Sequence, residues 1–338
     1  MAIGIDDAAV IDVHAHVRLQ ATNGAAGRYG PEFGTDESGK PWYRVGNYKL
    51  VGVKHTGSPF TDPELRLAKM REAHIDFQVL SPSPLTYFHH IELPVALAFC
   101  QRHNDAMAEL VSRYPDRLGG LVALPMQDPG AAVDELTRAV HELKLWGAAI
   151  GTEFAEPLHS AKWDRFYETL VALDVPLFIH PAPAGIDGPP GDPNLKRFDL
   201  DIIVGFGAQE AIAIATLIFG GVLDRHPKLD VWISHGGGAM PVMVGRLAQA
   251  ARKRPWATEE HKKDGAFEER LSRLWFDTHL SDARALALLK AIVGTTRLTY
   301  GTNFAGWDQS DDGHHGPIDP VLADNARRLL RRTATLRG

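Results

Sequence analysis

Two histidines separated by one residue follow the first apolar run of the chain. The run covers residues 8–13, and His14 and His16 come directly after it. Side chains two residues apart on an extended strand point to the same face, so both imidazoles can reach one point at the strand's exit. Neutral imidazole is a common ligand of divalent transition metals, which makes this spacing a candidate metal site. Two solvated loop histidines would give the same pattern.

Two more histidines and one asparagine end later apolar runs. His180 follows residues 177–179, His235 follows residues 231–234, and Asn303 lies three residues after the run 298–300. One histidine at a strand end is more often structural than a ligand. Four histidines at matching positions, from three separate runs, predict a convergent site: a metal centre with an added acid or base.

The elements that must position these residues alternate along the chain. Short apolar runs predict strands at 10–13, 77–80, 118–124, 148–151, 177–179, 231–233, 275–277 and 298–300. Amphipathic segments predict helices at 62–73, 93–114, 129–142, 161–173, 209–225, 240–251, 282–292 and 317–332. Eight strand–helix units predict an α/β fold of the (β/α)8 barrel type, with the site at the carboxyl ends of the strands. A doubly wound open sheet is the alternative, but no glycine-rich dinucleotide fingerprint opens the first unit.

A long insertion, residues 17–61, breaks this rhythm between the first strand and the first helix. It is rich in glycine and polar residues and has no clear helical pattern. On a barrel it would lie at the mouth of the active site, where long loops often act as lids. No linker divides the chain, so residues 1–338 are expected to form one domain with a lid-like insertion.

Composition excludes several classes of function. The chain has 338 residues, a net charge of -6 and no long basic stripe, which argues against a nucleic-acid partner. No apolar run is long enough to span a membrane, and the N-terminus does not have the pattern of a signal peptide. Cys100 is the only cysteine, which excludes an internal disulfide and favours a reducing, cytoplasmic location.

Taken together, the motifs resemble the amidohydrolase superfamily. They are His14-x-His16, Ile179-His180-Pro181, Ser234-His235-Gly-Gly-Gly and Gly301-Thr302-Asn303, in this order along nearly the whole chain. The similarity is closest to the branch typified by aminocarboxymuconate-semialdehyde decarboxylase. That branch also holds resorcylate-type decarboxylases and oxalomesaconate hydratase.

The resemblance implies a role for each matching position. His14, His16 and His180 would bind one divalent ion, zinc or alternatively manganese, and His235 would act as acid or base without binding it. Related enzymes usually carry an aspartate at the position of Asn303, which binds the metal and moves a proton. Binuclear relatives bridge their metals with a lysine after the fourth strand, and no lysine stands there, so one metal is expected.

The asparagine at position 303 departs from that pattern. An amide has no titratable proton acceptor in this pH range, and its carbonyl oxygen is only a weak ligand. Three explanations remain open: an inactivating substitution that traps a complex, a natural asparagine with His235 or Asp308 moving the proton, or a protein that has lost the original chemistry. A solvated loop carboxylate is the simpler interpretation of Asp308.

Other residues are candidates for contact with substrate. They are Lys54 and His55 in the insertion, His89 and His90 after the second strand, Glu153 after the fourth, and Asp308. Lys54 falls where the decarboxylase relatives carry an arginine that holds a carboxylate, and the paired histidines resemble those of the hydratase. Solvent exposure, the start of a helix or a salt bridge would explain each of these residues without any function.

The expected function is non-oxidative decarboxylation of a small aromatic or unsaturated carboxylic acid. Hydration or hydrolysis of a conjugated acid, lactone or amide by metal-activated water is the runner-up, and a non-catalytic binding protein is the third alternative. The expected partners are the small carboxylic acid and a second copy of the chain in a homodimer or higher oligomer, with neither nucleic acid nor membrane.

Overall fold

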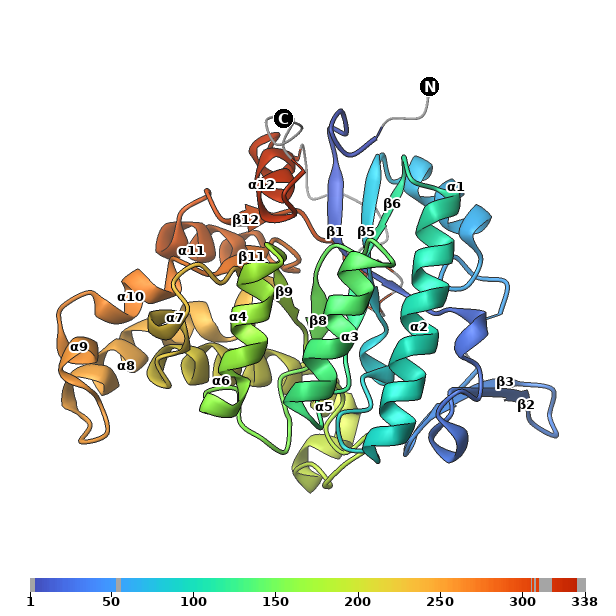
Figure 1. The fold of residues 1–338 in the computed structure, drawn as a ribbon, viewed down its shortest axis with the longest axis horizontal. Coiled ribbons are helices and arrows are strands. Elements are labelled where there is room, and N and C mark those ends of the chain that lie inside the picture. Colours follow the sequence, from blue (N-terminus) through green and yellow to red (C-terminus); the bar gives the residue numbers. More distant parts are fainter. Residues whose placement is uncertain (1–3, 53–55, 305, 307, 310–317, 333–338) are drawn as a thin grey trace.

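Parallel strands close into a barrel in the computed structural model, which describes residues 4–52, 56–304, 306, 308–309 and 318–332 (Figure 1). The strands are β1 (Ile11–Val17), β5 (Phe77–Pro82), β6 (Leu118–Gly120) with its continuation β7 (Val122–Ala123), β8 (Ala148–Ile150), β9 (Leu177–Ile179), β10 (Val231–Ile233), β11 (Trp275–Asp277) and β12 (Leu298–Thr299). Each pairs in parallel with the next in this order, except that β6 and β7 are one strand interrupted at Leu121. The ring closes where Val13 donates its backbone N–H to Tyr300 and His16 donates to Phe304. The predicted (β/α)8 barrel is therefore confirmed.

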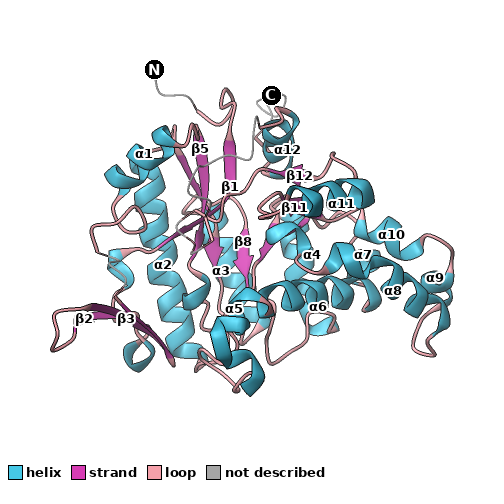
Figure 2. Ribbon diagram, turned by 180° about the vertical axis from the view of Figure 1, so that it is seen from behind, coloured by secondary structure: helices cyan, strands magenta, loops and turns pink. Residues whose placement is uncertain are grey.

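Helices surround this barrel, as Figure 2 shows from behind. They are α1 (Pro63–Glu72), α2 (Leu93–Arg113), α3 (Pro129–His141), α4 (Asp164–Ala172), α5 (Leu200–Ile203), α6 (Gly205–Phe219), α7 (Val222–Arg225), α8 (Met240–Lys253), α9 (Glu259–Lys262), α10 (Ala266–Leu271), α11 (Ala283–Val293) and α12 (Val321–Leu329). Aspartate side chains cap the first turns of α1, α3 and α11 at Asp62, Asp128 and Asp282. The helix predicted over 209–225 is two helices, because the chain turns at Gly220 and Gly221, where Gly221 has φ +69°.

No described helix is by itself long and apolar enough to cross a membrane. Only the consecutive helical segments Pro193–Ile203 and Gly205–Phe219, taken together, have the necessary length and apolar composition, and they are bent by 83° relative to each other.

Alternation along the strands places the site residues on the interior face. On β9, Leu177 and Ile179 pack outward against the helices, whereas Phe178 points into the barrel and stacks on Trp232 of β10, with ring centroids 4.0 Å apart. His180, two residues beyond Phe178, therefore continues the interior face at the carboxyl end.

The insertion is more regular than its composition indicates. Residues 32–51 form an antiparallel sheet of β2 (Glu32–Thr35), β3 (Pro41–Val45) and β4 (Tyr48–Val51), which projects beside the barrel in Figures 1 and 2. Tyr43 and Val45 of β3 are buried in one apolar cluster with Phe88 and Phe99. The sheet was not predicted, because its glycines and polar residues conceal short strands that are buried on one face only.

A buried polar network fixes the course of β1. The Asp12 carboxylate accepts hydrogen bonds from the backbone of His14 and Thr302, from the Thr302 hydroxyl and from the Gln78 amide, at 2.7–3.1 Å. Arg66 of α1 donates to the Gln78 carbonyl oxygen (2.9 Å) and to the backbone oxygen of His16 (2.5 Å). Burial raises the pKa of Asp12 to about 6, although these hydrogen bonds oppose the shift. The network thus joins β1, β5, α1 and the segment after β12 around the two histidines.

Replacing Asp12 with alanine should lower the free energy of unfolding by about 3 kcal/mol, because four buried donor groups lose their shared acceptor. Urea denaturation in the presence of a chelator measures this without a contribution from metal binding. Asp7→Ala, at an exposed position of the same segment, is the matched control. Equal stability of Asp12→Ala and the unsubstituted protein would contradict this role of the network.

Candidate metal centre and active site

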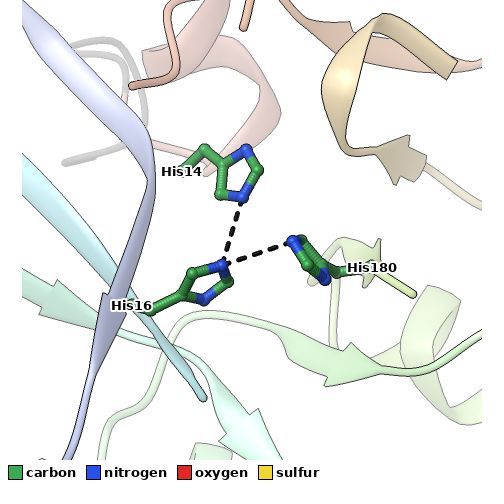
Figure 3. Close-up of side chains that lie close together, drawn as sticks. All are labelled: His14, His16 and His180. Carbon is green, nitrogen blue, oxygen red and sulfur yellow. Dashed lines mark hydrogen bonds between the residues drawn. The ribbon is translucent and has the colours of Figure 1, made fainter. Parts of the chain in front are cut away.

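The structure brings three predicted ligands together at the carboxyl ends of β1 and β9. Figure 3 shows the rings of His14, His16 and His180 facing one another. The Nε2 atom of His16 lies 3.3 Å from the Nε2 atoms of both His14 and His180. All three side chains are buried, and their donor atoms lie within 4.8 Å of one another.

The opposite nitrogen of each ring is held in place. Nδ1 of His14 lies 2.8 Å from the Asp277 carboxylate, Nδ1 of His180 lies 2.7 Å from the backbone oxygen of Pro181, and Nδ1 of His16 lies 2.9 Å from Ser81 Oγ. The carboxylate and the carbonyl can only accept, and the Ser81 hydroxyl donates to another carbonyl, so each Nδ1 carries the proton. The three Nε2 lone pairs therefore face one another without a proton between them.

This donor set fits a divalent ion. Two nitrogens that bind zinc tetrahedrally at roughly 2.0–2.1 Å lie about 3.3 Å apart, which agrees with the distances from His16 to His14 and to His180. Burial lowers the pKa of His14 and His180 well below the usual value and that of His16 to about 3, and the neighbouring histidines add to the effect. Neutral rings, each with Nδ1 anchored by a carboxylate, carbonyl or hydroxyl, are the arrangement that metal-binding histidines adopt.

Asn303 lies beside this cluster. Its neighbour Phe304 exchanges backbone hydrogen bonds with His14 and His16, and Asn303 lines the same cavity as His16 and His180. The Asn303 amide nitrogen donates to Asp308 Oδ1 at 2.6 Å, whereas its carbonyl oxygen is buried without a hydrogen-bond partner among the described residues. An unpaired buried oxygen costs free energy, so this atom is suited to a cation.

His235 forms a separate pair with Glu210. Its Nδ1 lies 2.7 Å from Glu210 Oε1, and Ser234 donates its hydroxyl to the same oxygen. Burial disfavours the charged imidazole, but the adjacent Glu210 carboxylate outweighs it and raises the pKa of His235 to about 9. Burial also raises the pKa of Glu210. His235 is thus held by a fully buried carboxylate of α6, and its raised pKa suits it to donate a proton.

A second histidine–carboxylate pair lies next to the first. His279 Nε2 is 3.2 Å from Asp308 Oδ2, and the ring of His279 lies 5.6 Å from that of His235 between centroids. Burial would raise the pKa of Asp308, but the hydrogen bond and charge of His279, the charge of His235 and the bond from Asn303 together lower it below its usual range. Asp308 is therefore an ionised group of the site and not a solvated loop carboxylate.

One cavity of about 750 Å³ connects these groups to the surface. His16, His180, His235, Asn303 and Asp308 lie on its polar side. Its other walls are mainly apolar and include residues from the insertion, the loop after β5, α5, α6 and the loop after β11, namely Tyr48, Leu50, Phe60, Leu85, Ile202, Ile203, Phe206 and Leu280. A cavity of this size and character fits a small, largely apolar molecule with one polar end.

The remaining predicted substrate residues lie elsewhere. His89, His90 and Glu153 line a separate small cavity of about 30 Å³, where the ring of His89 stacks on Tyr87 and burial lowers its pKa to about 3. None of these three is among the described residues that line the large cavity. Lys54 and His55 lie outside the described residues.

Several residues of the site were not predicted. Asp277 is the last residue of β11 and His279 follows it, in the strand-end pattern that identified the other histidines, so this signal was present in the sequence. Glu210 is a lone carboxylate, next to Gln209, in the otherwise apolar helix α6. Ser81 had no comparable signal, because serine at the end of a strand is common.

The sequence of this chain is similar to those of several known proteins. The profile of the family described as Amidohydrolase matches residues 11–332. A 2-amino-3-carboxymuconate-6-semialdehyde decarboxylase of Dictyostelium discoideum is 32% identical over 244 residues, which cover 72% of this chain and 66% of that protein, just under two thirds of its length. A 2-keto-4-carboxy-3-hexenedioate hydratase of Sphingobium sp. is 28% identical over 72% of this chain and 69% of its own length.

A solved structure has the same fold. It is a variant of 5-carboxyvanillate decarboxylase from Novosphingobium aromaticivorans with bound manganese and 3-methoxy-4-hydroxy-5-nitrobenzoic acid. Its sequence is 25% identical, and the alignment covers 81% of this chain and 82% of that one with a TM-score of 0.70. The family match over nearly the whole chain, together with these similarities, shows that this protein belongs to the amidohydrolase family, beside the aminocarboxymuconate-semialdehyde decarboxylases.

Proposed function

We propose that this protein is a metal-dependent lyase that removes carbon dioxide, without oxidation, from a small aromatic or unsaturated carboxylic acid. The observation that carries the proposal is the convergence of three unprotonated imidazole nitrogens at the end of an apolar cavity, next to the His235–Glu210 pair. The decarboxylases among the similar proteins support the same reaction class.

His14, His16 and His180 would hold the ion, with the carbonyl oxygen of Asn303 as a further ligand. The bound ion would supply a Lewis acid that holds an anionic substrate and withdraws electrons from it. We propose zinc, because three imidazoles at this spacing suit it, and manganese is the alternative. The solved relative with manganese supports that alternative.

His235 would supply the proton. Decarboxylation breaks the bond between the carboxyl carbon and the ring or alkene carbon, and that carbon must take up a proton as carbon dioxide leaves. His235 lines the cavity and is held by Glu210, so it can donate this proton and then recover one from water. Asn303 cannot do so, because a side-chain amide does not act as an acid in this pH range.

We also propose a domain organisation, a cellular location and an oligomeric state for the chain. Residues 1–338 would form one domain, with the insertion as a wall of the cavity. The chain would act in the cytoplasm, since its only cysteine, Cys100, is buried and unpaired. It would form a homo-oligomer, because large apolar side chains are exposed on the neighbouring helices α5, α6 and α8, at Ile203, Ile212 and Val242.

The reaction is tested by incubating the metal-loaded protein with a panel of hydroxybenzoic, aminobenzoic and muconate-like acids. Carbon dioxide release with one solvent hydrogen incorporated into the product would support a decarboxylase. Incorporation of oxygen from labelled water, without gas release, would instead identify a hydratase or hydrolase, as the similarity to the hexenedioate hydratase suggests. The absence of any product with all of these acids would contradict both.

Replacing His180 with alanine should reduce bound divalent metal to less than about a tenth of the unsubstituted level, because two imidazoles bind an ion much more weakly than three. Elemental analysis after dialysis measures this. His90→Ala, which alters a histidine outside the large cavity, should retain the metal and is the control. Equal metal contents in all three proteins would contradict the proposed ligands.

Replacing His235 with asparagine should lower kcat by about 10²–10⁴-fold while leaving the metal content unchanged, because the variant loses a proton donor and keeps the ligands. Steady-state kinetics with the substrate found above, together with elemental analysis of the same samples, separate the two effects. A loss of metal that parallels the loss of rate would show that His235 is a ligand and not the acid.

A further inference from the structure

The contact between Asn303 and Asp308 determines which way the Asn303 amide faces. The distance from Asn303 Nδ2 to Asp308 Oδ1 is 2.6 Å. The amide nitrogen donates to this oxygen, so the NH2 group of Asn303 faces Asp308 and the carbonyl oxygen faces away. The oxygen that is turned away is the buried, unpartnered one, in the cavity that His16 and His180 also line.

The backbone around the pair holds the same orientation. Asn303 has φ +50°, a left-handed conformation that asparagine and aspartate tolerate better than most other residues. Gly306 donates its N–H to the backbone oxygen of Asn303, and a Cβ at Gly306 would lie 2.5 Å from the amide nitrogen. Gly306 therefore lies so close to the NH2 side of the amide that any larger residue at this position would press on Asn303.

Asp308 is itself fixed from its other oxygen. Oδ2 lies 3.2 Å from His279 Nε2, and the backbone N–H of His279 donates to Asp277, whose second oxygen contacts the ring of His14. One connected set of hydrogen bonds thus runs from the outer nitrogen of a proposed ligand to the carboxylate that orients Asn303.

We propose that Asp308 is a positioning residue that directs the carbonyl oxygen of Asn303 to the metal. A single aspartate ligand would supply both an oxygen ligand and a negative charge. Here Asn303 would supply the oxygen, and Asp308 would supply the negative charge one side chain farther from the ion. This inference rests on the metal site proposed above.

The polarity of the contact gives the proposal a specific consequence. Asn303→Asp alone places two carboxylates where the structure has a 2.6 Å hydrogen bond, so the two groups repel each other and the new ligand is misdirected. The exchange Asn303→Asp with Asp308→Asn restores the bond with donor and acceptor reversed. It also retains the net charge, and it leaves one carboxylate oxygen directed to the ion.

The experiment measures the dissociation constants of Zn²⁺ and Mn²⁺ by competition with a chromogenic chelator. The proteins are the unsubstituted chain, Asp308→Asn, Asn303→Asp and the exchanged double variant. Asp308→Asn should weaken binding about 10-fold or more, as loss of a residue that orients a ligand commonly does. The exchanged variant should bind at least as tightly as the unsubstituted chain, and more tightly than Asn303→Asp alone. Circular dichroism checks that each variant is folded.

A second pair of variants separates positioning from the charge of Asp308. In an Asn303→Ala background the amide is absent, so adding Asp308→Asn should change the dissociation constant less than 2-fold. A 10-fold loss in that background would show that Asp308 acts by its charge alone and would overturn the inference. Asp7→Asn, which removes an exposed carboxylate outside this cavity, should leave metal binding unchanged.

The results distinguish this inference from the proposed function. Undetectable metal binding by the unsubstituted chain would overturn the metal site itself. Metal binding that is the same with and without Asp308→Asn would overturn only the role of Asp308.

Discussion

Three imidazole nitrogens that face one another, with His16 Nε2 lying 3.3 Å from Nε2 of both His14 and His180, are the constraint on which the rest of the site depends. With Nδ1 of each ring protonated, the three Nε2 lone pairs repel one another unless a cation lies between them. The protein holds it because each ring is fixed from its other nitrogen, by Asp277, Ser81 and the backbone of residue 181. Hydrogen bonds outside the cluster therefore orient the three rings in advance, so that an ion would bind without a further cost of ordering them.

The barrel makes this arrangement possible by closing β1 against the segment after β12. His14 and His16 lie on β1, while Asn303 and Phe304 follow β12, and backbone hydrogen bonds join the two segments. Asp12 adds a side-chain link, because it binds both the backbone of His14 and Thr302. A strand shift or a slipped register at this seam would separate residues that are nearly 290 positions apart in the chain.

Much of this was predictable, for identifiable physical reasons. Parallel strands that are buried on both faces give continuous apolar runs, so all eight strands could be predicted from the sequence, together with the histidines at the ends of β1, β9 and β10. The Glu210–His235 pair could not be predicted, because the sequence of a helix does not indicate which of its residues will contact the end of a strand 25 residues away. The insertion sheet was missed because a three-stranded sheet buried on one side has no periodicity strong enough to outweigh its glycines.

The distribution of proton donors and acceptors bears on which reaction the site suits. Adding water to an alkene, or hydrolysing a bond with it, requires a group beside the ion that accepts a proton from water. In the described part of the site, Asn303 offers an amide, which does not accept a proton in this pH range, and Asp308 already contacts Asn303 and His279. The Glu210 carboxylate raises the pKa of His235 and so favours the protonated imidazole, from which a proton can be donated. Protonation of carbon requires a proton donor of this kind, so the side chains of the site favour loss of carbon dioxide over addition of water.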